Sequence, residues 1–491
     1  MSAICSFYKD KTIFLTGGTG FIGKLLIEQL LRKTEPKRIY LLIRQKKGLS
    51  SDARIEKLFQ DVVFDRLRAE RSDFIGKIEI IPGDLSEDNL GISEEYIERL
   101  CETVEVVIHG GASVALNDDF KPVIDANLKG SLSMMKLCRK IKKLQIFALI
   151  STAYSFCPYT EIKEELYHIH ITINDLINLV DNLTEIELKE KSKEILGKWP
   201  NPYSLCKALV EDVLINQANG LPVVIIRPSI IMGTYSEPVP GWIDNYYGTT
   251  GILAAIKAGT IKVARIDPKA KADIVPGDIV ASCVLAAAYK NSLQRSSRVK
   301  PIYNCVAYKE TRPNWREILD LSKKHPYFNS FSQLIKPFHL ILEPNQDLFE
   351  IYSIIFHLIP ALFIDFIFKL FNRNPTMFIR YKKLCNFIQS ISYFGTRSWN
   401  FSNDNTVKLL NELSEEDKRL FQFDTKCIDW PSYLIDCFQG IIVYLFHEKP
   451  NFSNCTNLRK ETIDTVIKCI FCGLIAYILW NYVAFLIKSN S

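Results

Sequence analysis

The sequence lacks the features of a secreted or metal-stabilised protein. Residues 1–10 contain no basic patch followed by an apolar core, so they do not predict a secretory signal. The 13 cysteines show no regular spacing, and the one Cys-x-x-Cys pair, Cys469 and Cys472, has no second ligand pair nearby. We therefore expect free thiols in a reducing compartment, and neither a disulfide framework nor a metal site.

The chain also lacks a large excess of charge of either sign. Lys and Arg total 61 and Asp and Glu total 55, which leaves a net charge of +6. This excess is too small to predict nucleic-acid binding, but it suits a protein near an anionic membrane or substrate. Apolar residues make up 47% of the chain and charged residues 24%, which excludes a disordered chain, a collagen-like repeat and a polytopic channel. The length of 491 residues allows about three domains.

Short apolar runs alternate with helix-like segments in the first half of the chain. The runs span residues 11–15, 38–43, 78–82, 104–109, 144–151 and 223–227, and an amphipathic stretch at 24–32 follows the first of them. Such alternation is typical of an α/β fold whose parallel strands are covered by helices on both faces. We therefore predict a Rossmann-like doubly wound parallel sheet.

A glycine-rich turn, residues 16–23, directly follows the first run and opens the amphipathic stretch. This is the context in which three spaced glycines predict a dinucleotide site, because backbone N–H groups at the start of a helix bind a pyrophosphate. An ordinary glycine-rich turn is the alternative. The residues expected to contact the cofactor here are Thr16, Gly17, Thr19, Gly20, Phe21, Ile22 and Gly23. Further contacts are expected at Asp84, Leu85, Gly110, Gly111, Ala112, Asn127, Pro228 and Ile230.

The end of the second run bears on the type of cofactor. An NAD-binding chain usually has an acidic residue there, whereas this chain has Arg44 followed by Gln45, Lys46 and Lys47. The basic cluster favours a 2′-phosphate and hence NADPH, although a solvated charge run would look the same. Asp84, after the third run, is placed to meet the adenine amine.

A proton donor is predicted from the pair Tyr203 and Lys207. Residues four apart share a helix face, and hydride reduction of a carbonyl requires a proton for the developing alkoxide. Tyr203 can supply it if the Lys207 ammonium lowers its pKa, and Lys207 can also hold the nicotinamide ribose. Thr152, or Ser151 beside it, can donate a hydrogen bond to the same oxygen. A plain surface helix is the alternative; two other tyrosines, Tyr154 and Tyr159, compete for the role, and Tyr154 has no lysine four residues on.

Together these motifs resemble the extended short-chain dehydrogenase/reductases, and within them the alcohol-forming fatty acyl-CoA reductases. The resemblance covers nearly the whole chain and also rests on residues 41–44, 151–154, 227–230, 237–245, 273–278, 399–404 and 428–430. It departs at Gly111, where alanine is expected, and at residues 312–315. It implies NADPH-dependent reduction of a long-chain acyl-CoA to the primary alcohol, with release of CoA and a bound aldehyde intermediate.

The domain organisation follows from the same motifs. Residues 1–300 are expected to form the NADPH-binding domain, with an insertion at 155–200 as a candidate substrate cover, and residues 301–460 a mainly helical C-terminal domain. The apolar segment 351–371 is interrupted by His357, Pro360, Asp365 and Lys369. It is predicted to dip into a membrane or to cover the substrate; a membrane span and a soluble core helix remain alternatives.

Residues 469–487 carry no charge, so we predict a transmembrane tail anchor at 465–488, with a buried helix as the alternative. Arg459 and Lys460 outweigh Lys488 beyond the segment, which predicts a cytosol-facing catalytic domain on the lipid bilayer of an intracellular membrane. The last three residues match neither an endoplasmic-reticulum nor a peroxisomal signal, so the organelle stays open, as does the oligomeric state.

Three other functions remain open at this point. The first is a membrane-bound hydroxysteroid-type dehydrogenase, which would share Tyr203 and Lys207 but not the region from Trp399 to Trp430. The second is an acyl-CoA reductase that stops at the aldehyde. The third is a catalytically silent membrane scaffold, against which the intact glycine motif and Tyr–Lys pair argue.

Overall fold

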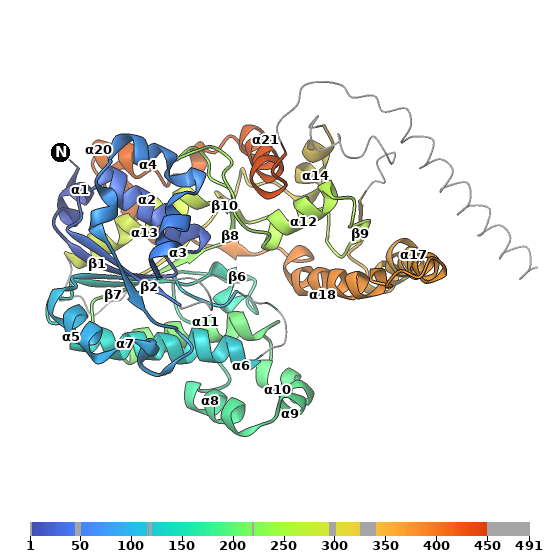
Figure 1. Ribbon diagram of the computed structural model, residues 1–491, viewed down its shortest axis with the longest axis horizontal. Helices are drawn as coiled ribbons and strands as arrows, with labels where there is room; N and C mark the ends of the chain where they lie inside the picture. The colour runs from blue at the N-terminus through green and yellow to red at the C-terminus, as the bar shows by residue number, and fades with distance from the viewer. Residues whose placement is uncertain are drawn as a thin grey trace, which may run out of the picture.

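The structure, a computed structural model, describes residues 2–44, 51–114, 116, 120–218, 220–293, 301–324 and 340–448. A seven-stranded sheet lies at its centre (Figure 1), with the strand order β11-β7-β5-β4-β1-β2-β3 and every neighbouring pair parallel. The strands are β1 Thr12–Thr16, β2 Arg38–Ile43, β3 Ile78–Pro82, β4 Val106–His109, β5 Ile146–Ile150, β7 Val223–Pro228 and β11 Ile302–Cys305. The six predicted runs all form strands, whereas β11 was not predicted.

Helices cover both faces of this sheet, which confirms the predicted parallel α/β fold. One face carries α2 Phe21–Lys33 and α13 Gly277–Ser292, and the other carries α5 Glu94–Thr103, α7 Gly130–Lys140 and α11 Pro202–Asn216 (Figure 1). Every residue of β1, β4, β5 and β7 is buried. Burial on both faces explains why these strands read as continuous apolar runs rather than alternating ones.

The remaining elements before residue 300 are short. They are α1 Ala3–Tyr8, α3 Ser51–Phe59, α4 Asp65–Glu70, α6 Phe120–Val123, β8 Ile230–Met232, α12 Gly248–Lys257, β9 Val263–Ala264 and β10 Ile274–Pro276. The insertion 155–200 forms β6 Glu161–Ile162, α8 Ile173–Asn182, α9 Glu185–Glu190 and α10 Ser192–Leu196. Arg227 holds it in place by donating to the carbonyls of Lys163 and Glu165, at 3.0 Å each.

The described residues after β11 are mainly helical. They form α14 Trp315–Lys324, β12 Ile341–Leu342, α16 Gln346–Ser353, α17 Ile359–Leu370, α18 Met377–Gly395, β13 Asn400–Phe401, α19 Asp404–Asn411, α20 Glu415–Leu420 and α21 Trp430–Gly440, with a π-helical turn η7, Ile354–Leu358, between α16 and α17. β13 pairs with β6 of the insertion. Figure 1 shows α17 and α18 projecting from the body of the molecule.

Within the described part of the chain, one continuous helical segment is long and apolar enough to cross a membrane. It spans Gln346–Leu370, and only 22% of its most apolar window is buried. Length and composition alone are weak evidence for a span. The predicted anchor at 465–488 lies outside the described residues.

Candidate active site

A cavity of about 1000 Å³ opens at the carboxyl ends of the central strands. Parallel α/β sheets place their ligand sites at this edge. Sixteen of the residues predicted from the sequence line it: Thr16, Gly17, Thr19, Gly20, Phe21, Ile22, Gly23, Gly110, Gly111, Ala112, Ser151, Thr152, Tyr203, Lys207, Pro228 and Ile230. Arg44, Asp84, Leu85 and Asn127 lie outside this lining.

The glycine-rich turn leaves room for a backbone-bound ligand. Gly17 has a φ of +77°, and a Cβ there would come within 2.7 Å of the Gly111 nitrogen. A Cβ on Gly23 would lie 2.1 Å from the Gly17 oxygen, so only glycine allows α2 to begin so close to β1. The N-cap of α2, Gly20, offers no side-chain hydrogen bond. The first N–H groups of this helix are therefore suited to an anionic group such as a pyrophosphate.

Neutral His109 helps to fix the Gly110–Gly111 segment, which packs against Gly17 of this turn. Burial, with a further contribution from Lys207, lowers the pKa of His109 to about 3. The Thr16 hydroxyl accepts from the Gly111 N–H at 3.0 Å and lies 2.7 Å from His109 Nδ1, to which its hydrogen can be donated. These contacts hold the Gly110–Gly111 segment against the end of β1.

Two predicted residues that lie outside the lining, Asn127 and Leu85, support the segment 110–113 after β4. The Asn127 side chain accepts from the Ser113 N–H at 2.7 Å and donates to the Ser113 carbonyl at 2.8 Å, which fixes the loop after β4. Leu85 packs so closely on Gly111 that a Cβ there would lie 2.6 Å from Leu85 Cδ1. An alanine at position 111 would therefore need Leu85 to move.

Arg44 and Asp84 meet at the ends of β2 and β3. Arg44 Nε lies 3.6 Å from Asp84 Oδ2, and the Arg44 side chain is 65% exposed. Asp84 also accepts from the backbone and hydroxyl of Ser86, at 3.0 and 2.8 Å. The Arg44 guanidinium is thus accessible beside the glycine-rich turn, while Asp84 already has several donors. Residues 45–47 lie outside the described part.

Tyr203 and Lys207 both come from the first turns of α11. The Asn201 side chain accepts from the Ser204 N–H at 2.9 Å, and Pro202 occupies the first helical position, so the helix begins just before Tyr203. Lys207 Nζ donates to the Ile150 carbonyl at 3.0 Å and lies 5.9 Å from the centroid of the Tyr203 ring. The helix therefore places both side chains at the end of β5, facing the cavity.

The expected lowering of the Tyr203 pKa is not found in the structure, and this corrects the sequence-based prediction. Burial raises the pKa of Tyr203 to about 12. It lowers the pKa of Lys207 to about 8, although the nearby Glu211 carboxylate raises that pKa in part. Desolvation is the largest cause at both groups, and no attraction to the Lys207 ammonium offsets it at Tyr203. Tyr203 is consequently protonated at neutral pH, as a proton donor must be.

Ser151 and Thr152 have different surroundings. Ser151 donates its hydroxyl hydrogen to Glu211, which also forms a fully buried ion pair with Arg227. Thr152 Oγ1 accepts from the Tyr154 N–H at 3.2 Å, which leaves its own hydrogen able to point into the cavity. Of the two hydroxyls, Thr152 is thus the one suited to donate to a bound carbonyl.

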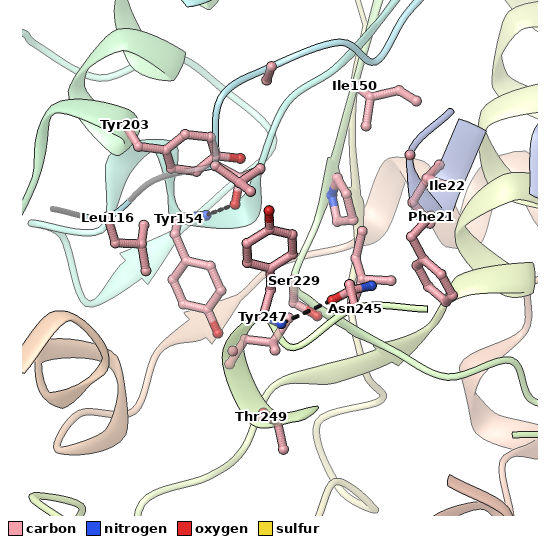
Figure 2. Close-up of a pocket in the computed structure, with 18 of the residues that line it drawn as sticks. Phe21, Ile22, Leu116, Ile150, Tyr154, Tyr203, Ser229, Asn245, Tyr247 and Thr249 are labelled. Atoms are coloured by element: carbon pink, nitrogen blue, oxygen red, sulfur yellow. Dashed lines mark hydrogen bonds between the residues drawn. The ribbon is translucent and has the colours of Figure 1, made fainter. Parts of the chain in front are cut away.

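Sequence reasoning missed part of the lining. Figure 2 shows Tyr247 with its hydroxyl directed towards the middle of the cavity, and Asn245, whose side chain accepts from the Tyr247 N–H at 3.0 Å. Ser229 Oγ is buried there with no hydrogen-bond partner in the described part of the chain. Asn245 is the last residue of the motif at 237–245, to which no role was assigned from the sequence. That motif was the signal that could have identified Asn245 as a lining residue.

The motif loop is fastened to the start of α2. Trp242 stacks on Phe21 with ring centroids 5.1 Å apart, and Lys24 Nζ lies 2.6 Å from Asp61 and 2.9 Å from Asp244. These contacts bring residues 244–249 to the cavity beside the glycine-rich turn. The glycine-rich turn and the loop 244–249 are therefore joined directly.

Much of the remaining lining comes from α12 and from the second half of α18. α18 contributes Asn386, Phe387, Ser390, Ile391, Phe394 and Gly395. The insertion 155–200 was predicted from the sequence as a candidate substrate cover, but no residue from that range lines the cavity. The exposed surface of the cavity is mostly apolar, which suits a ligand with a hydrocarbon part. Among the described residues, no group of three or more His, Cys, Asp or Glu could hold a metal ion.

Comparison with known proteins gives consistent matches over most of the chain. Two family models, both described as male sterility protein, match residues 15–284, an NAD-binding part, and residues 356–448. The chain is 36% identical over 445 residues to fatty acyl-CoA reductase wat of Drosophila melanogaster, covering 91% of this chain and 86% of that protein. It is 31% identical over 455 residues to fatty acyl-CoA reductase 1 of Homo sapiens, covering 91% and 87%.

Solved structures share the fold. The terminal R domain of the myxalamid biosynthetic pathway matches with a TM-score of 0.60 at 18% identity, covering 90% of this chain and 92% of that one. The reductase domain of a non-ribosomal peptide synthetase from Mycobacterium tuberculosis matches with a TM-score of 0.57, also at 18% identity, covering 88% and 92%. At this identity the likeness supports the architecture alone.

Proposed function

The chain belongs to the fatty acyl-CoA reductase family, and on that basis we propose that it reduces long-chain fatty acyl-CoA to the primary alcohol and releases CoA. The observation that carries the proposal is that the glycine-rich turn, Thr152, Tyr203 and Lys207 line the same cavity. The relatives that match over most of the chain are named fatty acyl-CoA reductases. An apolar lining beside the polar groups supports a substrate with a long hydrocarbon tail.

The cofactor we propose is NADPH, held by residues 16–23 and by the accessible guanidinium of Arg44. The cradle at Gly17 and Gly23 fits a dinucleotide, because a Cβ at either position would clash with backbone. Arg44 supports the 2′-phosphate form, since a guanidinium binds phosphate oxygens well. When bound, the reduced nicotinamide supplies hydride, and two hydrides are needed to take a thioester to an alcohol.

The chain's own residues stabilise and protonate the reacting oxygen. Thr152 and Tyr203 donate hydrogen bonds to the thioester carbonyl oxygen, which becomes negatively charged as the carbon is reduced. Collapse of this tetrahedral species breaks the C–S bond and expels the CoA thiolate. In the second reduction Tyr203 donates its hydroxyl proton to the aldehyde oxygen, while Lys207, tied to the Ile150 carbonyl, keeps positive charge nearby. The apolar walls keep the aldehyde from water between the two steps.

The proposed location is an intracellular membrane, endoplasmic reticulum or peroxisome, with the catalytic domain towards the cytosol. The apolar helical segment Gln346–Leu370 supports association with a bilayer. The proposed division remains residues 1–300 for the reductase domain, 301–460 for the helical domain and 465–488 for the anchor.

Product analysis tests the proposed reaction. Membranes that contain the protein are incubated with acyl-CoA of several chain lengths and NADPH, and the lipids are then separated by chromatography. Fatty alcohol with free CoA supports the proposal. Aldehyde alone would indicate a reductase that stops halfway, and no acyl-dependent NADPH oxidation at any chain length would favour the hydroxysteroid-type dehydrogenase or an inactive scaffold.

A further inference from the structure

The helices that project from the body of the molecule have an inverted distribution of polar and apolar side chains. In η7 and α17 the buried residues include His357 and Asp365, which are 6% and 7% exposed. The exposed side chains include large apolar ones, at Ile354, Ile355, Ile359, Leu362, Phe366 and Leu370, with exposures of 38% or more. A helix that covers a protein core shows the opposite arrangement. We call these six residues, together with Phe371 at the end of α17, the apolar face.

The buried polar groups of this segment are satisfied by hydrogen bonds. His357 Nε2 accepts from the Lys262 N–H at 2.9 Å. The Asp365 carboxylate accepts from the N–H groups of Met377 and Phe378, both at 2.8 Å, and thereby caps the start of α18. These bonds fix which side of the hairpin faces inward, so the apolar face is turned outward by specific contacts.

The charges on the turn after α17 and on the first half of α18 are positive, whereas the exposed carboxylate of Glu350 lies one helical turn before Ile354. Between residues 351 and 385 the sole carboxylate is Asp365, which is used in the cap. The basic side chains in this stretch are exposed and flank the turn between the two helices: Lys369, Arg373, Arg380, Lys382 and Lys383. Apolar side chains rimmed by cations complement a lipid surface with anionic headgroups.

Helix α18 connects this face to the active-site cavity. Its first turns lie at the hairpin tip, with Phe378 and Ile379 exposed, and its second half lines the cavity with Phe387, Ile391 and Phe394. Figure 1 shows α18 running from the tip back to the body. At 1.5 Å per residue, about 12 Å of helix separate residue 379 from residue 387. The apolar face thus lies beside the apolar wall of the cavity.

We propose that the apolar face docks on an anionic lipid surface and dips into it without crossing, so that α18 meets acyl tails held in the lipid. The second half of this statement rests on the proposed reductase function. The continuous helix Gln346–Leu370 is long enough to cross a bilayer core, but hydrogen bonds tie His357 to Lys262 and Asp365 to the start of α18, so its inner side stays on the protein. The chain then turns back into α18, which fits insertion to interfacial depth, about 5–10 Å.

Hydroxyl-radical footprinting of the full-length protein tests the docking without reference to catalysis. Oxidation of Phe366 and Phe371 is measured without lipid, with phosphatidylcholine vesicles, and with vesicles that also contain phosphatidylserine. We expect a several-fold loss of oxidation that is larger with the anionic vesicles, and no change at the exposed ring of Tyr159 on the insertion. Unchanged oxidation, equal protection by both vesicles, or protection that grows with protein concentration in the absence of lipid would each overturn the proposal; the last would indicate a second copy of the chain.

Kinetics of surface variants test the link to the substrate. The triple variant Phe366→Ser/Leu370→Ser/Phe371→Ser removes exposed apolar groups, and Ile75→Ser/Ile186→Ser is the matched control at exposed positions elsewhere. For palmitoyl-CoA presented in vesicles, the triple variant is expected to raise KM several-fold with kcat unchanged. For octanoyl-CoA in solution, triple variant, control and wild type should agree. An unchanged KM on vesicles would contradict the link between docking and substrate. If the wild type does not reduce acyl-CoA at all, the reductase function is contradicted, and the footprinting experiment alone then tests the docking.

Discussion

At the scale of single residues, burial controls the proposed chemistry as much as spacing does. Tyr203 and Lys207 share a face of α11 because they are four residues apart, which the sequence shows directly. Their protonation is set mainly by burial, which leaves the pKa of Tyr203 at about 12 and that of Lys207 at about 8. Ser151, adjacent to Thr152, is committed to Glu211 instead of the cavity.

Replacing Tyr203 by phenylalanine should remove the proton donor while keeping the shape of the cavity. We expect the Tyr203→Phe variant to lose about 100- to 10,000-fold in kcat. Binding of NADPH, followed by fluorescence titration, should stay close to wild type, because the phenyl ring still fills its place. A variant that forms alcohol at the wild-type rate would assign proton donation to another group, with Tyr154 and Tyr247 the next to examine.

The low pKa of Lys207 predicts a pH limit for activity. The lysine is charged below about pH 8 and loses its proton above that value, while Tyr203 stays protonated up to about pH 12. The kcat/KM should therefore fall as the pH rises through about 8. In Lys207→Arg, whose guanidinium keeps its charge, the remaining activity should lack this decline. A wild-type profile that is flat between pH 7 and 10 would show that the charge of Lys207 is not required.

Arg44 provides a separate test of cofactor preference. Arg44→Asp should raise the KM for NADPH by about 10- to 100-fold, because a charge-assisted bond to phosphate is replaced by repulsion. The KM for NADH, which has no 2′-phosphate, should change much less, and Arg44→Lys should recover part of the preference. Steady-state kinetics with both cofactors measures this. An equal loss with both would remove Arg44 from phosphate recognition.

At the scale of elements, the sequence predicted most of the sheet and little of what encloses the cavity. Continuous apolar runs identified six strands because these are buried on both faces. β11 was missed, since its four residues, Ile302–Cys305, form a short run next to a region that reads as helical. The contributions of α12 and α18 could not be predicted, because they depend on contacts between segments more than a hundred residues apart in the chain.

Glu237, in the loop before α12, holds this loop to α2 by ion pairs, and these pairs predict how stability depends on pH. Burial opposes ionisation of Glu237, yet its ion pairs with Lys33 and Arg32 on α2 outweigh burial and lower its pKa to about 2. A lowered carboxyl pKa stabilises the folded state above the ordinary value of 4.5, and this contribution is lost as the pH falls towards 2. Glu237→Gln should therefore cost about 2 kcal/mol in the free energy of unfolding at pH 7.

Thermal or urea unfolding at two pH values measures the effect of Glu237→Gln. The difference from wild type should be full at pH 7 and less than half as large at pH 3. Glu98→Gln, an exposed carboxyl on α5, is the control and should have little effect at either pH. A difference that does not depend on pH would mean that Glu237 acts through packing and not through its ion pairs.

At the scale of the whole molecule, the reductase site and the lipid-directed hairpin belong to one arrangement. The glycine-rich turn and the Tyr203–Lys207 pair lie at the edge of the central sheet, and α18, whose second half lines the cavity, is part of the hairpin that projects from the body (Figure 1). In the proposed orientation, with the catalytic domain towards the cytosol and the hairpin on a membrane, the cavity would meet anionic acyl-CoA at the lipid surface. The net charge of +6 favours the same encounter.

The central claim is that this one cavity carries a thioester through two reductions. Palmitoyl-CoA is incubated with the protein and NADPH deuterated at the transferable position, and the alcohol is examined by mass spectrometry. The account predicts hexadecanol that carries two deuterium atoms on its first carbon, formed by the wild type and lost in Tyr203→Phe. Aldehyde with a single deuterium as the final product, or no labelled lipid at all, would contradict it.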